Sequence, residues 1–351
     1  MRAVYAEHPF SIGIRDIDIP DIRDNEVLIK VAYTGICGSD LHAYHGLHAF
    51  RKPPVMLGHE VSGTIAKIGA NVSGLSIGQP VSVMPQINCG QCRACREGRP
   101  HLCENRIMPA MPGWNGLGTF GDYFSAPASV ICPLGDVPLD LGALTEPLAV
   151  ATHLMSRIPK DHDNELVIIG AGTIGLLLLL IAPSYGFKKI LITDIIDKNL
   201  ELAKELGAAE AVNALSCDAV QAVKQSFGTL GCGNIIVAAG GPDIMDQAIQ
   251  MARPGANIMF VAMITHDSTF GTYPIVFKEL NILGSFNYTL ADFDTAIGFL
   301  RSDGARIRRI ITHVKSIDDA AEAFHILDKK SEYAIKILLQ TDPADRASAL
   351  K

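Results

Sequence analysis

The chain has 351 residues, which is longer than most single domains and therefore predicts two domains. Hydrophobic residues make up 48% of the sequence and charged residues 19%, a composition that excludes a disordered protein. The formal net charge is −7, and no basic block compensates for it. This charge balance argues against a nucleic-acid partner.

The sequence also argues against a secreted or membrane protein. Residues 1–10 lack the apolar segment of a secretory signal. The most hydrophobic run, residues 174–182, meets Pro183 and is far shorter than the roughly 20 residues that cross a bilayer. Clustered cysteines in such a chain favour metal binding over disulfides, so we expect a cytoplasmic protein without a membrane partner.

Short apolar segments separated by turns fill roughly the first third of the chain, which predicts a mainly β domain. Segments with the composition of strands lie at residues 26–31, 61–65 and 81–83. Glycine and proline punctuate them, as in Gly78-Gln79-Pro80.

From residue 165 onward, apolar strands alternate with helical stretches, which is the pattern of a parallel α/β sheet. The candidate strands are residues 166–169, 190–193, 234–238 and 257–261. The clearest helical pattern is at 198–206. A helix near 318–327 and a strand at 335–339 are expected at the end of the chain.

A glycine-rich turn, Gly170-Ala-Gly-Thr-Ile-Gly175, follows the first of these strands and opens a helix. Its glycines suit a tight turn, the approach of a pyrophosphate to the backbone, and close helix–strand packing. An ordinary strand–helix turn is the alternative interpretation. Asp194 ends the next strand and could accept hydrogen bonds from ribose hydroxyls while repelling a 2′-phosphate, so we expect NAD rather than NADP. The candidate cofactor-binding residues are Gly170, Gly172, Thr173, Ile174, Gly175 and Asp194.

Four cysteines with the spacing C-x2-C-x2-C-x7-C form the most specific pattern in the chain. They are Cys89, Cys92, Cys95 and Cys103. Four thiolates this close in sequence can converge on one tetrahedral ion. The run therefore predicts a closed structural zinc site.

A second set of donors is scattered along the first domain. A catalytic zinc with one open position is suited by mixed sulfur, nitrogen and oxygen ligands. Such ligands are offered by Cys37, His59, Glu60 and Glu146. Taken singly, Cys37 could be a buried hydrophobic residue, Glu60 an ion-paired acid and Glu146 a helix cap.

Two polar residues beside Cys37 could move a proton. We expect Ser39 to pass the proton of a zinc-bound alcohol outward and His42 to deliver it to solvent through the cofactor ribose, while Glu60 acts near the metal. The catalytic candidates are therefore Ser39, His42 and Glu60.

Taken together, these motifs resemble the zinc-dependent medium-chain dehydrogenase/reductase family, in its sorbitol (polyol) dehydrogenase-like branch, over essentially the whole chain. The resemblance rests on Cys37-Gly-Ser-Asp-Leu-His42, Gly58-His59-Glu60, the cysteine run, Gly121-Asp122-Tyr123, Glu146-Pro147-Leu148, and the glycine-rich turn with Asp194. It implies two zinc ions per subunit, one catalytic and one structural, together with NAD.

The resemblance also implies an architecture. Residues 1–149 are expected to form a GroES-like catalytic domain that residues 284–351 complete, and residues 150–283 a Rossmann-type, doubly wound NAD-binding domain. Homodimers or homotetramers are usual in such proteins.

Two features narrow the range of substrates within this branch of the family. Glu146-Pro147 resembles polyol dehydrogenases, whereas threonine dehydrogenases usually read Asp-Pro-Phe-Gly-Asn in this region. Asn287 stands where sorbitol dehydrogenases often carry an arginine, which argues against sorbitol itself.

The sequence therefore predicts NAD-linked oxidation of a secondary alcohol of a polyol or sugar alcohol to a ketone. A sugar phosphate, such as a hexitol phosphate, or a sugar acid is the alternative substrate, and L-threonine is disfavoured. An anionic substrate requires a basic residue in the cleft, for which Lys278, Arg51 and Lys52 are candidates. A non-catalytic NAD- and zinc-binding regulatory protein is the alternative from another class.

Overall fold

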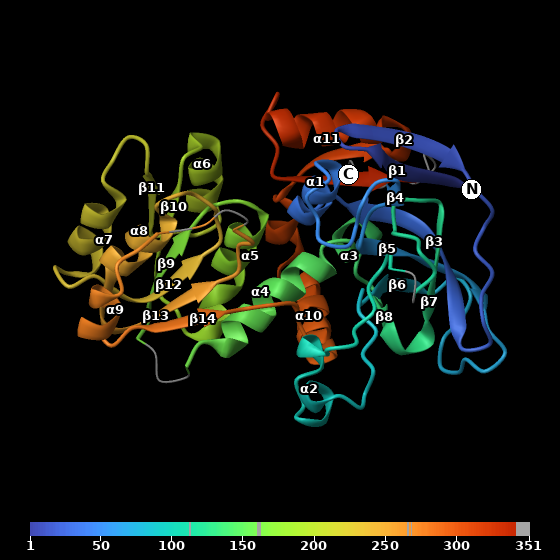
Figure 1. Ribbon diagram of the computed structural model, residues 1–351, viewed down its shortest axis with the longest axis horizontal. Helices are drawn as coiled ribbons and strands as arrows, with labels where there is room; N and C mark the ends of the chain where they lie inside the picture. Colours follow the sequence, from blue (N-terminus) through green and yellow to red (C-terminus); the bar gives the residue numbers. More distant parts are fainter. Residues whose placement is uncertain (112–113, 160–162, 265–266, 268, 342–351) are drawn as a thin grey trace. The chain divides into compact units, whose positions relative to one another are not determined.

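The computed structural model describes residues 1–111, 114–159, 163–264, 267 and 269–341. The chain forms two compact units (Figure 1). One comprises Met1–Ala149 with Thr289–Lys351, and the other comprises Val150–Tyr288. Strand β14 (Asn281–Gly284) pairs within the sheet of the second unit.

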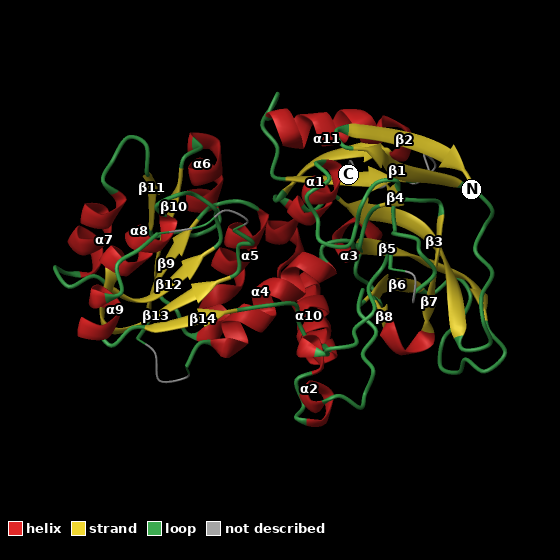
Figure 2. Cartoon of the chain, viewed as in Figure 1, coloured by secondary structure: helices red, strands yellow, loops and turns green. Residues whose placement is uncertain are grey.

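The first unit is built on two β-sheets, whose strands are drawn as yellow arrows in Figure 2. The larger sheet follows the order β15-β16-β3-β5-β6-β8, with β7 also paired to β3, and the smaller sheet follows the order β2-β1-β4. The strands are β1 (Arg2–His8), β2 (Ser11–Asp16), β3 (Glu26–Gly35), β4 (Val55–Met56), β5 (Glu60–Ile68), β6 (Pro80–Val83), β7 (Tyr123–Pro127), β8 (Ile131–Pro133), β15 (Ile311–Ser316) and β16 (Lys336–Gln340).

Helices connect these strands, and the longest of those described in this unit, α10, lies in the C-terminal segment. The helices are α1 (Gly38–Tyr44), α2 (Arg93–Arg96), α3 (Leu139–Gly142), α4 (Thr145–Arg157), α10 (Leu290–Arg308) and α11 (Ala320–Lys329). Helix α10 begins with a capping box, in which the Thr289 amide donates to Asp292 and the Asp292 amide donates to the Thr289 hydroxyl. The boundary between the two units falls within α4.

The C-terminal segment completes the core of the first unit. Phe324 and Ile337 pack in one buried cluster with Val4 and Phe120 from the N-terminal part of the chain. Phe120 and Phe324 meet edge to face, with their ring centroids 6.1 Å apart. The two segments therefore share one hydrophobic core, although residues 150–288 separate them in sequence.

The second unit contains six parallel strands in the order β11-β10-β9-β12-β13-β14. Its elements are β9 (Glu165–Ile169), α5 (Thr173–Ile181), β10 (Lys189–Asp194), α6 (Asp197–Glu205), β11 (Glu210–Asn213), α7 (Ala219–Phe227), β12 (Cys232–Val237), α8 (Ile244–Met251), β13 (Ala252–Phe260), α9 (Tyr273–Phe277) and β14. The chain reverses its direction of winding between β9 and β12, because β9 leads to β10 on one side and β12 to β13 on the other. Since such crossovers are right-handed, helices cover both faces, and this strand order is that of a dinucleotide-binding fold.

The strands and helices expected from periodicity are confirmed. Residues 166–169 lie in β9, and residues 198–206 overlap α6. Strand β12 is buried at every position, which explains its unbroken apolar sequence, because helices cover both faces of a parallel sheet. The periodicity did not predict the 19-residue helix α10 or the edge strand β14.

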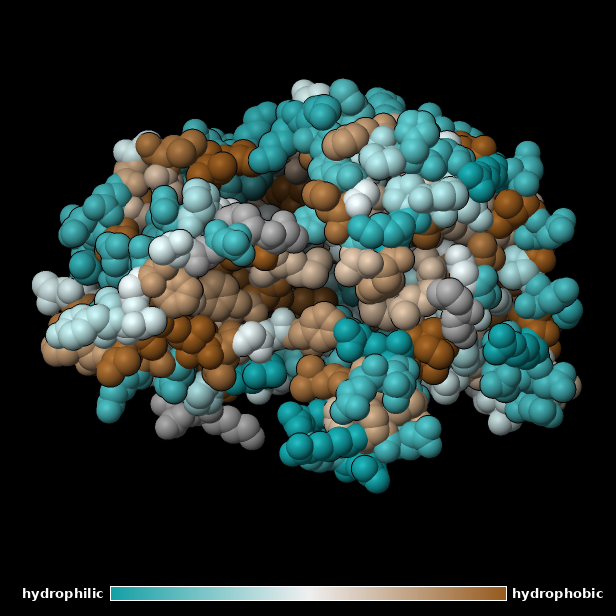
Figure 3. Space-filling model, in the orientation of Figure 1, coloured by the Kyte–Doolittle hydropathy of each residue, from teal (hydrophilic) through white to brown (hydrophobic). Residues whose placement is uncertain are grey.

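Helix α9 exposes several large hydrophobic side chains. Tyr273, Val276 and Phe277 are each more than 70% exposed. Figure 3 shows hydrophobic residues gathered on this face of the molecule over α9 and β14. Among the described strands, β14 pairs with β13 alone, so its other edge is open.

No helix within the described ranges combines the length and the apolar composition that crossing a bilayer requires.

Candidate functional site

The pairing of β3 with β5 brings the metal-ligand candidates of the first unit together. Gly35, at the end of β3, lies opposite Glu60, at the start of β5. Cys37 follows Gly35 by two residues, and His59 directly precedes Glu60. As a result, the ligand atoms of Cys37, His59 and Glu60 all lie within 4.8 Å of one another.

Two glycines make this close approach possible. A Cβ on Gly35 would lie 1.9 Å from a carboxylate oxygen of Glu60. Gly58 has a φ of +97°, and a Cβ there would lie 2.3 Å from the ring of Phe120. Only glycine adopts this conformation without strain while leaving room for the ring, so Gly58 sets the position of His59.

A buried lysine holds Glu60. The ammonium of Lys336, on β16, donates to both carboxylate oxygens of Glu60 at 2.8 Å and to the carbonyl of Ile36 at 3.0 Å. Lys336 is 3% exposed and Glu60 is 1% exposed. Burial alone would lower the pKa of Lys336, but the charge of Glu60, with smaller contributions from Cys37 and Glu146, holds this pKa above its ordinary value.

Glu146 lies in the first turn of α4 and is buried. Its carboxylate adds to the negative charge that raises the pKa of Lys336, which places it in the electrostatic neighbourhood of Glu60. It does not belong to the described group of ligand atoms formed by Cys37, His59 and Glu60. The structure thus gathers three of the four expected catalytic ligands into one tight group.

Sequence reasoning missed Asp40, which is fully buried on α1. Its carboxylate accepts hydrogen bonds from the Cys37 amide at 3.0 Å and from the Gly58 amide at 3.3 Å. The carboxylate also lies 3.5 Å from Nδ1 of His59. A carboxylate against the second ring nitrogen of a ligand histidine fixes the orientation of that ring. Although burial disfavours a charged ring, the Asp40 carboxylate raises the pKa of His59 well above its ordinary value. The signal for Asp40 was its place three residues after Cys37 in the same motif.

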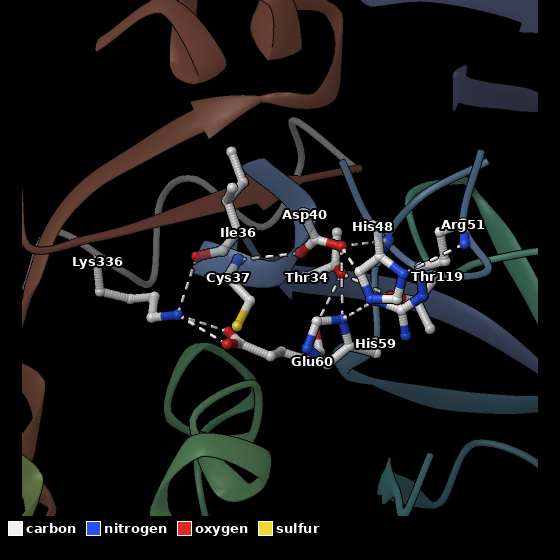
Figure 4. Close-up of polar contacts among 11 residues, drawn as sticks. Thr34, Ile36, Cys37, Asp40, His48, Arg51, His59, Glu60, Thr119 and Lys336 are labelled. Atoms are coloured by element: carbon white, nitrogen blue, oxygen red, sulfur yellow. Dashed lines mark hydrogen bonds and ion pairs between the residues drawn. The ribbon is translucent and has the colours of Figure 1, made fainter. Parts of the chain in front are cut away.

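Arg51 was considered only as a base in the cleft, yet the structure buries it beside Asp40. Its guanidinium lies 3.6 Å from the Asp40 carboxylate and 3.3 Å from Nδ1 of His59. The side chain is 2% exposed. His48 holds this segment, because its Nδ1 accepts the amide of Arg51 at 3.2 Å. Burial, followed by the charge of Arg51, lowers the pKa of His48 to about 4. Figure 4 shows Arg51 on one side of the donor group and Lys336 on the other.

The two relay candidates share helix α1, which starts directly after Cys37. Ser39 and His42 are three residues apart, so their side chains lie on one face of the helix. Both are half-buried and remain partly accessible to solvent. This arrangement suits transfer of a proton from the metal-ligand region outward.

The cysteine run forms a compact lobe around α2. Sγ–Sγ distances are 3.5 Å for Cys92–Cys95, 3.5 Å for Cys89–Cys103 and 3.9 Å for Cys92–Cys103. A tetrahedron with zinc–sulfur bonds of roughly 2.3 Å requires sulfurs roughly 3.8 Å apart. Backbone amides of Gln91 and Cys92 lower the pKa of Cys89 to about 6, which favours the thiolate that binds metal. The donor chemistry and the spacing both fit a closed zinc site.

The glycine-rich turn of the second unit has the expected geometry. Gly170 has a φ of +107°, a Cβ on Gly172 would meet nothing within 4 Å, and a Cβ on Gly175 would lie 1.8 Å from the Gly170 carbonyl. These values suit a tight turn, open space for an approaching pyrophosphate and close helix packing, respectively. Thr173 and Ile174 form the first turn of α5, directly after Gly172.

Asp194, at the end of β10, lies beside this turn. Its carboxylate accepts the Ala171 amide at 2.6 Å and the Ile195 and Ile196 amides at 2.8 and 2.9 Å. These contacts tie the end of β10 to the glycine-rich turn at the carboxyl edge of the parallel sheet, where dinucleotides bind in such folds.

The other basic candidates for an anionic substrate already have main-chain partners. The ammonium of Lys278 donates to the carbonyls of Ile249 and Ala252, and that of Lys52 donates to the carbonyl of Gly46. Asn287, in the segment where an arginine was considered, has a φ of +52°.

Comparison with known proteins agrees with this geometry. Residues 23–136 match the model of the alcohol dehydrogenase GroES-like domain, and residues 173–302 match the model of the zinc-binding dehydrogenases. The chain is 34% identical over 338 residues to D-xylulose reductase A of Aspergillus oryzae, covering 93% of each protein.

Two solved structures from Escherichia coli superpose on most of the chain. An oxidoreductase/dehydrogenase of unknown specificity gives a TM-score of 0.91 at 28% identity, covering 97% of this chain and 99% of that one. Galactitol-1-phosphate dehydrogenase gives a TM-score of 0.87 at 28% identity, covering 97% of this chain and all of that one.

Fold and site together define a zinc-binding dehydrogenase with a GroES-like and a Rossmann-type domain. The chain belongs to the zinc-dependent medium-chain dehydrogenase/reductase family, in its sorbitol dehydrogenase-like branch. The fold class and the family expected from the motifs are confirmed.

The buried ion pair of Glu60 leads to a prediction about stability. Replacing the lysine in Lys336→Met leaves the Glu60 carboxylate buried without its cation, so we expect the zinc-depleted protein to lose about 3–5 kcal/mol of unfolding free energy. Urea denaturation in the presence of a chelator measures this loss. Lys336→Arg keeps the charge and is expected to lose much less. An unchanged stability of Lys336→Met would show that the pair does not stabilise the fold.

Proposed function

We propose that this protein oxidises a secondary alcohol of a polyol to a ketone, with transfer of a hydride to NAD. The observation that carries this proposal is the convergence of Cys37, His59 and Glu60 within 4.8 Å, at the start of the helix that bears Ser39 and His42. A thiol, an imidazole and a carboxylate are donors that zinc accepts in catalytic sites. The curated relative is named a D-xylulose reductase, and reduction of a ketose is the reverse of the oxidation proposed here.

In this proposal, Cys37 and His59 would hold the catalytic zinc, and Glu60, Glu146 or a bridging water would complete its ligands. When bound, zinc polarises the substrate hydroxyl and NAD provides the hydride acceptor. Asp40 orients the His59 ring, and Lys336 holds Glu60 in place by donating to both of its carboxylate oxygens.

The protein's own residues move the alcohol proton. The substrate hydroxyl gives its proton to Oγ of Ser39, which passes its own proton to a ring nitrogen of His42, from which the proton leaves to solvent. The partial exposure of both side chains supports this direction. A protein that binds NAD and zinc without catalysis would have no use for these two groups.

We assign NAD binding to the second unit and zinc chemistry to the first. The glycine-rich turn would hold the pyrophosphate through Gly170, Gly172, Thr173, Ile174 and Gly175. Asp194 would accept hydrogen bonds from the ribose hydroxyls. The lobe formed by Cys89, Cys92, Cys95 and Cys103 would hold the structural zinc.

A free polyol is favoured over a phosphorylated one. The named E. coli relative acts on galactitol 1-phosphate, so a sugar phosphate is the second candidate substrate. However, the lysines considered for an anionic group donate to main-chain carbonyls, and Arg51 is buried against Asp40. These contacts favour a neutral substrate.

We also propose a cytoplasmic homo-oligomer. None of the eight cysteines, all of which lie within the described residues, forms a disulfide, which suits a reducing compartment. The open edge of β14 and the exposed side chains of α9 provide a surface on which a second copy can extend the sheet.

The substrate assignment is tested by measuring NADH formation with free polyols, their phosphates, sugar acids and L-threonine. We expect turnover of a free polyol that a chelator abolishes. Cys37→Ser should lose at least about a hundredfold in kcat while retaining NADH binding, because removing a metal ligand leaves the second unit intact. Activity confined to phosphates would favour the second candidate substrate. If the protein binds NADH but turns over none of these compounds, the result would favour the regulatory alternative.

Coenzyme choice is tested by Asp194→Ser. Loss of a charged acceptor for the ribose hydroxyls should reduce kcat/KM with NAD by roughly tenfold to a hundredfold and reduce the preference over NADP. Steady-state kinetics with both coenzymes measure the ratio. If the ratio of kcat/KM with NAD to that with NADP does not change, Asp194 only accepts hydrogen bonds from the backbone amides near it.

The oligomer interface is tested by Val276→Asp combined with Phe277→Asp. Because charges on an apolar contact surface oppose association, we expect a lower mass by light scattering than for the unchanged protein. The matched control is Ile77→Asp, at a side chain that is 71% exposed in the other unit. An unchanged mass would exclude α9 from the interface.

A further inference from the structure

His48 lies in the loop between α1 and β4, and contacts at both ends of this loop tie it to the candidate site. Near the start of the loop, the amides of Leu47 and His48 donate to the carbonyl of His42 at 2.8 and 3.2 Å. At its other end, the guanidinium of Arg51 lies 3.6 Å from the Asp40 carboxylate (Figure 4). His48 is therefore held between a relay candidate and the carboxylate that supports a metal-ligand candidate.

The hydrogen bonds of the His48 ring determine which of its nitrogens carries the proton. Nδ1 accepts hydrogen bonds from the amides of Phe50 at 3.4 Å and Arg51 at 3.2 Å. The ring is neutral at physiological pH, because burial and the charge of Arg51 lower the pKa of His48 to about 4. A ring nitrogen that accepts hydrogen bonds carries no proton, so the single proton of the neutral ring is on Nε2. Nε2 is therefore a hydrogen-bond donor.

This donor has a fixed direction and is accessible to a ligand. The side chain of His48 is half-buried, and none of the described residues accepts a hydrogen bond from Nε2. The ring of Phe50 meets the imidazole edge to face, with the ring centroids 4.5 Å apart and the planes at 90°. Together with the two amides on Nδ1, this contact sets the orientation of the ring before any ligand binds.

The surroundings of His48 indicate the kind of group that its donor suits. The same loop exposes two apolar side chains, Leu47 at 68% and Phe50 at 44%. His59 and His42 are among the groups that act electrostatically on the His48 ring, which places it in the neighbourhood of the proposed catalytic zinc. A neutral N–H donor beside apolar side chains matches a carbon chain that bears an uncharged hydroxyl group.

We propose that Nε2 of His48 donates a hydrogen bond to a substrate hydroxyl on the carbon next to the one that is oxidised. His48 thereby selects polyols over alcohols with a single hydroxyl group. This inference rests on the polyol oxidation proposed above and names the residue that recognises the second hydroxyl. Because the second hydroxyl does not react, its hydrogen bond is equally strong before and during hydride transfer, so it lowers KM and leaves kcat unchanged.

The experiment compares the oxidation of 2,3-butanediol with that of 2-butanol by the full-length, zinc-loaded protein. The two compounds differ by one hydroxyl group next to the reacting carbon. His48→Asn keeps an acceptor near the position of Nδ1 but has no donor where Nε2 lies. We expect kcat/KM for the diol to fall roughly tenfold, through KM, with little change for 2-butanol. KM for the best polyol of the substrate panel should rise to the same extent.

His48→Gln is the matched variant. Its side-chain amide reaches the position of Nε2 and restores a donor there, while the acceptor at the position of Nδ1 is lost. We therefore expect His48→Gln to keep the preference for the diol. A histidine that only holds the loop would give the opposite result, with the preference kept in His48→Asn and lost in His48→Gln.

A pH profile and a control variant separate recognition from other roles of a histidine. The pH profile of kcat should be the same in His48→Asn and His48→Gln as in the unchanged protein, because a neutral His48 passes no proton. A shifted profile would assign His48 to the proton relay and overturn the inference. His8→Asn, at an exposed histidine of the same unit, should leave the kinetics with both alcohols unchanged.

The outcomes distinguish failure of this inference from failure of the proposed function. An unchanged preference for the diol in His48→Asn, with an unchanged KM for the best polyol, would overturn the inference and leave the proposed activity intact. Loss of the preference in both variants would also overturn it, because a restored donor would then have no effect. If the unchanged protein oxidises no alcohol of the panel, the proposed function fails and the inference fails with it.

Discussion

The register between β3 and β5 is the constraint on which the site depends. With Gly35 opposite Glu60, the two strands bring Cys37 and His59 to the same edge of the sheet. A shift of one residue would turn Glu60 to the other face, because successive side chains of a strand alternate. The register is protected by Gly35 and Gly58, where any larger side chain would collide with Glu60 or Phe120. Backbone pairing, rather than the ligands themselves, therefore assembles the donor group.

Once assembled, the group concentrates negative charge in a buried place, and the fold balances it with cations from distant segments. Lys336 lies on β16, the last strand in sequence, and donates to both carboxylate oxygens of Glu60. Arg51 comes from the loop before β4 and faces Asp40. Buried charges without partners are strongly destabilising, so these cations stabilise the buried carboxylates of Glu60 and Asp40.

The two units divide the chemistry between different kinds of local structure. In the first unit, the catalytic candidates lie on strand ends and on α1, where long-range pairing fixes them. In the second, the cofactor candidates lie at the carboxyl ends of β9 and β10, beside the point where the strand order reverses. Relatives of the chain include a D-xylulose reductase and a galactitol-1-phosphate dehydrogenase. The partners of Lys278, Lys52 and Arg51 are the structural reason to favour a neutral substrate here.

The sequence by itself determined the features whose residues are close along the chain. The cysteine lobe and the glycine-rich turn could be predicted because a short segment has few ways to place four thiols or three glycines. The family followed from the joint occurrence of such segments. Tertiary structure alone decided that Lys336 reaches Glu60, that Asp40 supports His59, that Glu146 stands outside the tight donor group, and that Arg51 is buried rather than presented to a substrate. These outcomes depend on strand pairing and burial between residues far apart in sequence, and local spacing contains no information about which distant charge packs against which.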